Sequence, residues 1–177
     1  MATATISDND NITVSVGDVP VNEGSTGTVF ANFPLTLSGP SEQSITVNYQ
    51  TADASATAPG DYTAANDTLT FAPGQTAATV GVSVVGDTAA ELDEAFVLSL
   101  TAASGRGVSI GTANGTATIK DDDIADIDFT TATSFLNEGA GTLTLTLNLS
   151  GPKGQPITVP ILLNGSAGAL SPDFSDL

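Results

Sequence analysis

The sequence predicts an all-β protein whose main body is a two-sheet antiparallel sandwich of seven strands. Three observations lead to this prediction. Thr, Val, Gly and Ala dominate a composition in which 40% of the 177 residues are hydrophobic, which is enough to build a core. No long stretch has the apolar spacing of a helix, whereas short alternating stretches recur along the chain. Clusters of Gly, Pro, Asn and Asp separate these stretches, as turns separate the strands of a sandwich.

The alternating stretches define the strands in order along the chain. In the clearest one, Val80, Val82 and Val84 alternate with polar or small residues, so one face of this strand is apolar. The same reasoning predicts seven strands, near residues 12–16, 27–37, 45–51, 67–72, 77–85, 95–102 and 113–120.

An internal repeat of about 112–115 residues sets the predicted domain organisation. The segments that recur are residues 2–10 and 115–123, Asn22-Glu23-Gly24 and Asn137-Glu138-Gly139, and Leu37-Ser38-Gly39-Pro40 and Leu149-Ser150-Gly151-Pro152. We therefore expect the last strand of a preceding repeat in residues 1–10, one complete domain in 11–123, and the first half of a following repeat in 124–177. This half should supply strands near residues 125–130, 141–149 and 156–163. Because a strand is already under way at residues 2–6, we also expect the chain to be a piece of a longer protein.

The charge balance excludes several classes of function. Twenty acidic residues oppose only Arg106, Lys120 and Lys153, and the net charge is −17. Such a chain repels phosphate groups, so neither nucleic acid nor an anionic membrane surface is an expected partner. The absence of Cys and His excludes thiolate sites and the usual zinc and copper sites. No apolar run of 18 residues is present, so no membrane insertion is expected, and we find no secretion signal.

The acidic residues gather between the predicted strands, above all at 87–94 and 121–123. In a seven-strand sandwich the loop after the fifth strand and the end of the seventh emerge at the same end, so these two groups should converge. Two carboxylates about 4 Å apart repel by roughly 4 kcal/mol at an effective dielectric constant near 20. Calcium relieves such repulsion well, because it accepts six to eight oxygen ligands in flexible geometry, whereas Mg²⁺ fits less readily.

Five motifs in sequence order resemble the Calx-β domain of sodium/calcium exchangers and of many bacterial surface proteins. The resemblance covers residues 11–123 and implies an immunoglobulin-like Greek-key sandwich. The matching stretches are residues 21–24 (VNEG), 49–53 (YQTAD) leading to 60–62 (GDY), 70–76 (TFAPGQT), 91–96 (ELDEAF) and 118–123 (TIKDDD).

The resemblance also implies a set of calcium ligands. It consists of Glu23, Asp61, Asp87, the backbone carbonyl of Ala89, Glu91, Glu94, Asp121, Asp122 and Asp123. The acidic loop of the exchangers opens with consecutive aspartates, whereas this chain has Gly86 before Asp87. We therefore expect one or two calcium ions rather than four.

Other acidic residues have simpler interpretations. Asp53 is expected to cap a turn, and Asp93 should face solvent because it points away from its neighbours in an extended loop. Asp8 and Asp10 lack the other ligands of their repeat, and Glu138 and Asp173 lack the later acidic loop, so these sites should be weak or empty. We expect Tyr62, Phe71 and Phe96 to pack in the core or at its rim.

These observations predict a calcium-binding structural or adhesion repeat of a large extracellular protein, in which calcium orders the acidic loops and the joint between neighbouring repeats. Two alternatives stay open: a regulatory calcium sensor of a membrane protein, and a subunit of a strand-exchanging extracellular fibre with cell-surface or self-association partners. Glu91 and Glu94 could form an acid/base pair for glycoside cleavage. However, the chain has no Trp to stack on a sugar and few basic groups to hold a substrate, so we do not expect an enzyme.

Overall fold

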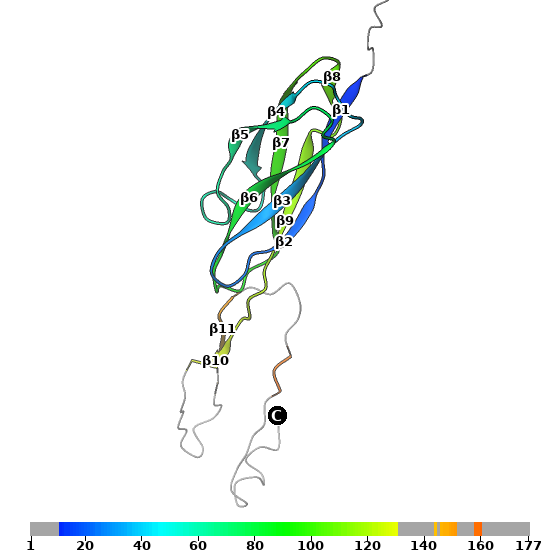
Figure 1. The fold of residues 1–177 in the computed structure, drawn as a ribbon. Helices are drawn as coiled ribbons and strands as arrows, with labels where there is room; N and C mark the ends of the chain where they lie inside the picture. The colour runs from blue at the N-terminus through cyan, green and yellow to red at the C-terminus, as the bar shows by residue number, and fades with distance from the viewer. Residues whose placement is uncertain (1–10, 131–143, 145, 152–157, 161–177) are drawn as a thin grey trace, which may run out of the picture.

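The computed structural model describes residues 11–130, 144, 146–151 and 158–160, and residues 11–120 form a β-sandwich (Figure 1). Its strands are β1 (Ile12–Val16), β2 (Val19–Asn22), β3 (Gly27–Leu37), β4 (Ile45–Asp53), β5 (Asn66–Phe71), β6 (Ala77–Gly86), β7 (Glu94–Ser104), β8 (Val108–Ile110) and β9 (Asn114–Lys120). One sheet has the order β6-β3-β1-β8, and the other has the order β2-β9-β7-β4-β5. The all-β sandwich predicted from the sequence is thus confirmed.

The core lies between the two sheets and contains the apolar residue of each alternating pair. Val80, Val82 and Val84 of β6 are buried, as their spacing predicts. Tyr62, Phe71 and Phe96 are also fully buried, so the prediction that these aromatic rings pack in the core is confirmed. The ring of Tyr62 stacks on Phe96 with 4.1 Å between centroids and 8° between planes, an arrangement that stabilises beyond the area buried.

The strand count differs from the prediction, because the sandwich has nine strands rather than seven. All seven predicted strands are present, and β2 and β8 are additional. Each of the two lies at an edge of its sheet and pairs in parallel: β1 with β8, and β2 with β9. The sandwich is therefore antiparallel except at these two edge pairs. The chain leaves β1 at Gly17 and Asp18 and enters the opposite sheet as β2.

A hairpin of β10 (Ile127–Phe129) and β11 (Leu147–Leu149) follows the sandwich. Its register repeats that of β1 and β3: Ile127 pairs with Leu149 as Val14 pairs with Leu37. The two strands lie within the ranges predicted at 125–130 and 141–149. Of the third predicted strand, residues 158–160 are described and form no strand, and the remainder lies outside the described residues. Residues 1–10, with Asp8 and Asp10, also lie outside them, as do Glu138 and Asp173.

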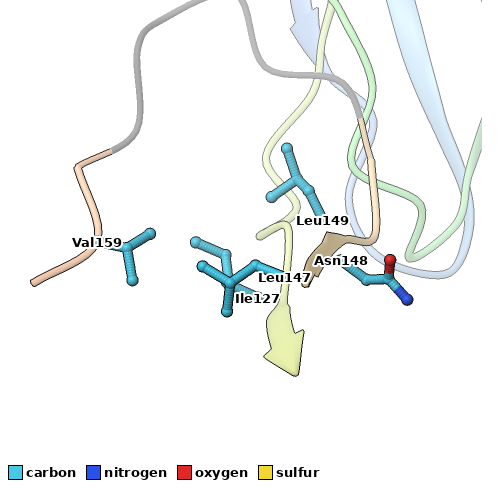
Figure 2. Close-up of a pocket in the computed structure, with 5 residues that line it drawn as sticks. All are labelled: Ile127, Leu147, Asn148, Leu149 and Val159. Carbon is cyan, nitrogen blue, oxygen red and sulfur yellow. The ribbon is translucent and has the colours of Figure 1, made fainter. Parts of the chain in front are cut away.

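An apolar hollow of about 160 Å³ lies beside the hairpin. Figure 2 shows the side chains of Ile127, Leu147, Asn148, Leu149 and Val159 around it. By the repeat, the four apolar residues of this set correspond to Val14, Leu35, Leu37 and Val47, all of which are buried in the first sandwich. In the predicted following repeat, this hollow would be one corner of a second sandwich core. The division of the chain after residues 10 and 123 stays a prediction.

Within the described residues, no helix has the length and apolar character needed to cross a membrane.

Candidate metal centre

The chain leaves the sandwich and continues to β10 at one end of the two sheets (Figure 1). Acidic residues collect at this end. Because β2 and β9 run parallel and Asn22 lies opposite Lys120, both strands end side by side. The residues that follow them, Glu23 and Asp121, therefore lie near each other. β6 ends and β7 begins at the same end, so the loop of residues 87–93 joins the group. The convergence of the 87–94 and 121–123 segments, which was predicted from the strand order, is thus observed.

Strand alternation decides which acidic residues face the interior. Glu94 starts β7 on the face that carries Phe96 and is partly buried. Asp121 and Asp123 continue the face of Ile119 and are also partly buried, whereas Asp122 lies on the other face and is exposed. The alternation thus directs every second acidic residue inward.

Glu23, Asp121 and Asp123 form the innermost part of the group. One carboxylate oxygen from each lies within 4.8 Å of the other two. The Glu23 side chain is 5% exposed, and its Oε1 has no hydrogen-bond partner among the described residues. A buried oxygen without a partner costs about 1–3 kcal/mol, and more when it is charged. This arrangement therefore favours a bound cation.

The carboxylates around Glu23 change its acidity. Burial is the main cause that raises the Glu23 pKa from 4.5 to about 7, and nearby negative charges add to it, from Glu91, Asp87, Asp121 and Asp123. At neutral pH, Glu23 therefore takes up a proton much more readily than a glutamate in water.

Two further glutamates have raised pKa values for the same reasons. For Glu91 the causes are burial and then the negative charges of Asp87, Asp61, Asp121 and Asp123. For Glu94 they are burial, the charge of Asp61, a hydrogen bond with Asp61 and the charge of Glu91. These interactions connect seven carboxylates, which we call the acidic cluster: Glu23, Asp61, Asp87, Glu91, Glu94, Asp121 and Asp123.

The loop between β4 and β5 holds Asp61 in place. Asp61 Oδ2 accepts hydrogen bonds from the Thr57 backbone N–H (2.6 Å) and the Thr57 hydroxyl (3.3 Å). The loop is also tied to the first turn of β7, because Ala95 N–H donates to Ser55 Oγ (2.8 Å) and the Ala95 carbonyl accepts from Ala56 (2.9 Å). The loop therefore presents Asp61 beside Glu94, the residue before Ala95.

Asp53 fixes the other end of this loop. Its Oδ1 accepts hydrogen bonds from the Tyr62 hydroxyl (2.6 Å) and the Ala58 backbone (3.0 Å), and these two bonds lower the Asp53 pKa. The prediction that Asp53 caps a turn is thus confirmed. The sequence did not lead us to predict that Thr57 and Ser55 hold this loop by hydrogen bonds, although Ser and Thr are common capping residues in loops.

Asp122 and Ala89, two of the predicted ligands, form hydrogen bonds within the turns of the site. Asp122 Oδ1 accepts a hydrogen bond from the Gly24 backbone (3.1 Å), which fixes the turn that carries Glu23. The Ala89 backbone N–H donates to Asp87 Oδ1 (2.6 Å) and so closes a turn in the acidic loop. Metal ligation by Asp122 and by the Ala89 carbonyl stays a prediction.

Gly86, the departure from the exchanger pattern, lies tightly against the turn of Glu23 and Gly24. A Cβ atom at this position would approach the Gly24 carbonyl and come within 2.5 Å of the Glu23 carbonyl oxygen. An aspartate therefore does not fit here unless the Glu23 turn moves. The expected number of ions stays a prediction.

The basic residues do little to offset the charge of the cluster. Lys120 forms an ion pair with Asp93 (3.3 Å between Nζ and Oδ2) on the exposed face, so Asp93 faces solvent as predicted. Arg106 lies between β7 and β8, at the opposite end of the sandwich, and Lys153 is outside the described residues. A divalent cation bound by oxygen ligands would supply the missing positive charge, and calcium suits such a ligand set.

A β-sandwich with an acidic, cation-attracting cluster at one end is the class of protein that this fold and site define. The chain belongs to the Calx-beta domain family, because the model of that family matches residues 7–123. A comparison with curated protein sequences finds no match.

Solved structures with the same fold include several Calx domains. The apo form of the Calx CBD1 domain is 26% identical, with a TM-score of 0.57, and the match covers 64% of this chain and 100% of that one. CBD12 from CALX1.2 is also 26% identical, with a TM-score of 0.57 over 78% of this chain and 57% of that one. The calcium binding domain CBD12 of CALX1.1 is 26% identical, with a TM-score of 0.56 over 62% and 44%. This chain thus spans about half the length of the two CBD12 structures.

Proposed function

We propose that this chain is a calcium-binding repeat module with a structural or adhesive role in a large extracellular protein. The observation that carries the proposal is the buried Glu23 carboxylate, which has an oxygen without a hydrogen-bond partner and lies beside Asp121 and Asp123. Calcium would neutralise the acidic cluster and accept oxygen ligands from Glu23, Asp121 and Asp123, with Asp61, Asp87, Glu91 and Glu94 around them. One of the similar solved structures is described as a calcium binding domain, which supports this choice of ion.

The place of the cluster on the chain supports the structural role. The cluster lies where the sandwich ends and the chain continues into the β10–β11 hairpin. The carboxylate oxygens of Glu23, Asp121 and Asp123 lie within 4.8 Å of one another, and two charges at that separation repel by roughly 3 kcal/mol at an effective dielectric constant near 20. A bound ion removes this repulsion, so the loops and the joint between repeats should become ordered together.

Calcium titration of the whole chain by calorimetry, with thermal unfolding in calcium and in chelator, tests the binding. We expect millimolar calcium to raise the melting temperature of the wild type and of Asp93→Asn, whose carboxylate lies outside the cluster. The double variant Asp87→Asn/Glu94→Gln should show little or no increase. If wild type and double variant respond alike, these residues do not hold the ion. Small-angle scattering should show a more extended chain in calcium, and an identical profile would contradict the spacer role.

Two alternative functions make different predictions. A regulatory sensor of a membrane protein needs a dissociation constant of about 10⁻⁷–10⁻⁵ M, whereas extracellular modules bind calcium at about 10⁻⁴–10⁻³ M. The calorimetric constant therefore separates sensor from spacer. A strand-exchanging fibre requires chains to associate, so its mass in solution should increase with protein concentration.

A further inference from the structure

The start of the following repeat touches the acidic loop directly. Gly151, in the turn after β11, lies against Ala90. A Cβ atom at Gly151 would be 2.9 Å from Ala90 Cβ and 3.0 Å from the Ala90 carbonyl carbon, well inside the optimal carbon–carbon separation of about 3.5–4.0 Å. Ala90 is only 3% exposed although it lies between the acidic residues Asp87 and Glu91. The contact therefore closes over a residue of the loop that supplies part of the cluster.

The same turn occurs in the first repeat, where it has no such neighbour. Ser38 accepts a hydrogen bond from Thr13 through its hydroxyl (3.0 Å) and donates its own N–H to the Thr13 carbonyl (2.9 Å). Ser150 makes the same pair of bonds with Asp126, at 2.8 and 3.0 Å. Both serines precede a glycine, and the sequence Leu-Ser-Gly-Pro is shared. The same turn structure thus occurs in both repeats.

The two glycines differ in what surrounds them. A Cβ atom at Gly39 would meet nothing within 4 Å, whereas one at Gly151 would overlap Ala90. Neither glycine has a positive φ, so the turn itself does not require glycine at either position. Glycine is required at position 151 because the neighbouring acidic loop leaves no room for a side chain. Gly39 therefore provides a matched control within the same chain.

We propose that the acidic loop of residues 87–93 is the docking surface for the turn of Ser150 and Gly151 in the next repeat, and that metal bound in the cluster is coupled to this docking. The docking stands on the contact of Gly151 with Ala90, and the coupling rests on the calcium binding proposed above. An ion held by Asp87 and Glu91 fixes the backbone of Ala90 between them, and with it the surface that receives the turn. By linkage, the docked turn must strengthen ion binding by the same factor.

Hydrogen–deuterium exchange of the whole chain tests the docking in chelator, without any metal. The overlap at Gly151→Ala should loosen the contact and speed exchange in peptides covering residues 87–93 by about fivefold or more. Gly39→Ala carries the same methyl group in the same kind of turn and should exchange as the wild type does. Ala90→Gly removes the methyl group that the loop contributes to the contact, so it should speed exchange of residues 146–151. Unchanged exchange in Gly151→Ala and in Ala90→Gly would overturn the docking.

Adding calcium tests the coupling. Calcium should slow exchange of residues 146–151 in the wild type and in Gly39→Ala but not in Gly151→Ala, and Gly151→Ala should bind calcium about fivefold more weakly. Equal slowing and equal affinity in all three proteins would overturn the coupling. If calcium slows no segment of the wild type, including residues 87–93, then the calcium function fails. The chelator experiment still decides the docking in that case.

Discussion

Replacement of Glu23 by Gln should stabilise the metal-free protein and weaken calcium binding in the same molecule. The pKa of Glu23 is about 7 in the folded chain, against 4.5 for an ordinary glutamate, mainly because the side chain is buried. A carboxyl group with a raised pKa in the folded state binds protons more strongly when folded. The free energy of unfolding therefore falls as pH rises from about 4.5 to about 7, and is level above that range.

The size of the effect follows from the pKa difference. About 2.5 pH units at 1.36 kcal/mol per unit gives an upper bound of about 3 kcal/mol at pH 8. The Gln amide leaves a polar group buried and recovers only part of this, so we expect a gain of about 1–2 kcal/mol, or roughly 4–10 °C in melting temperature. At pH 4.5 or below the wild-type carboxyl is protonated when folded, and the variant should show no gain.

Thermal unfolding in chelator at pH 4.5 and pH 8, followed by calcium titration at pH 8, measures both effects. Gln lacks the negative charge that attracts the ion, so calcium affinity should fall by at least tenfold. Glu42→Gln is the control, because Glu42 is exposed in the β3–β4 loop at the opposite end of the sandwich. A Glu23→Gln variant that melts below the wild type in chelator at pH 8, or that binds calcium as tightly, would refute the reasoning.

Three further predictions concern the cluster and the strand that carries it. At pH 7, where Glu23 is about half protonated, calcium binding should release roughly half a proton from this residue, seen as a buffer-dependent binding enthalpy that disappears above pH 8. Asp123→Asn should weaken calcium binding by roughly tenfold or more, whereas Asp93→Asn should bind as the wild type does; equal losses by calorimetry would contradict the inward and outward assignment. Gly115→Ala places a Cβ atom 2.6 Å from the Gly17 carbonyl oxygen, so it should lower the free energy of unfolding in urea by about 1–3 kcal/mol and weaken calcium binding.

The sequence was sufficient to locate the strands with strong alternation, but not those at the sheet edges. β2 contains Pro20, which is a poor residue for a central strand, and its four residues alternate in burial but are too few to establish a period. The structure places β2 at the outer edge of its sheet, where proline is tolerated. β8 has only three residues, too few to show a period. Both parallel pairs join segments about a hundred residues apart, and no local pattern reports such a pairing.

The carboxylates of the site could be predicted from the sequence, and the orientation of Asp122 could have been predicted better. The motifs gave all seven carboxylates of the acidic cluster. Alternation along β9 continues into the 121–123 run, so the same rule that placed Asp93 on the solvent side would have separated Asp122 from its neighbours. The docking of Gly151 on Ala90 could not be predicted, because it depends on how one repeat meets the next.

Of the two strands that were not predicted, β2 is the one that builds the site. Residues 12–16 lie in one sheet, and after Gly17 and Asp18 the chain crosses to the other sheet as β2. The Asp18 side chain accepts a hydrogen bond from Thr116 of β9 (2.8 Å), which fixes this crossing. Because β2 then runs parallel to β9, its C-terminal end lies beside the C-terminal end of β9, and Glu23 meets Asp121. An antiparallel edge strand would have carried Glu23 to the opposite end of the sandwich, away from every other carboxylate of the acidic cluster.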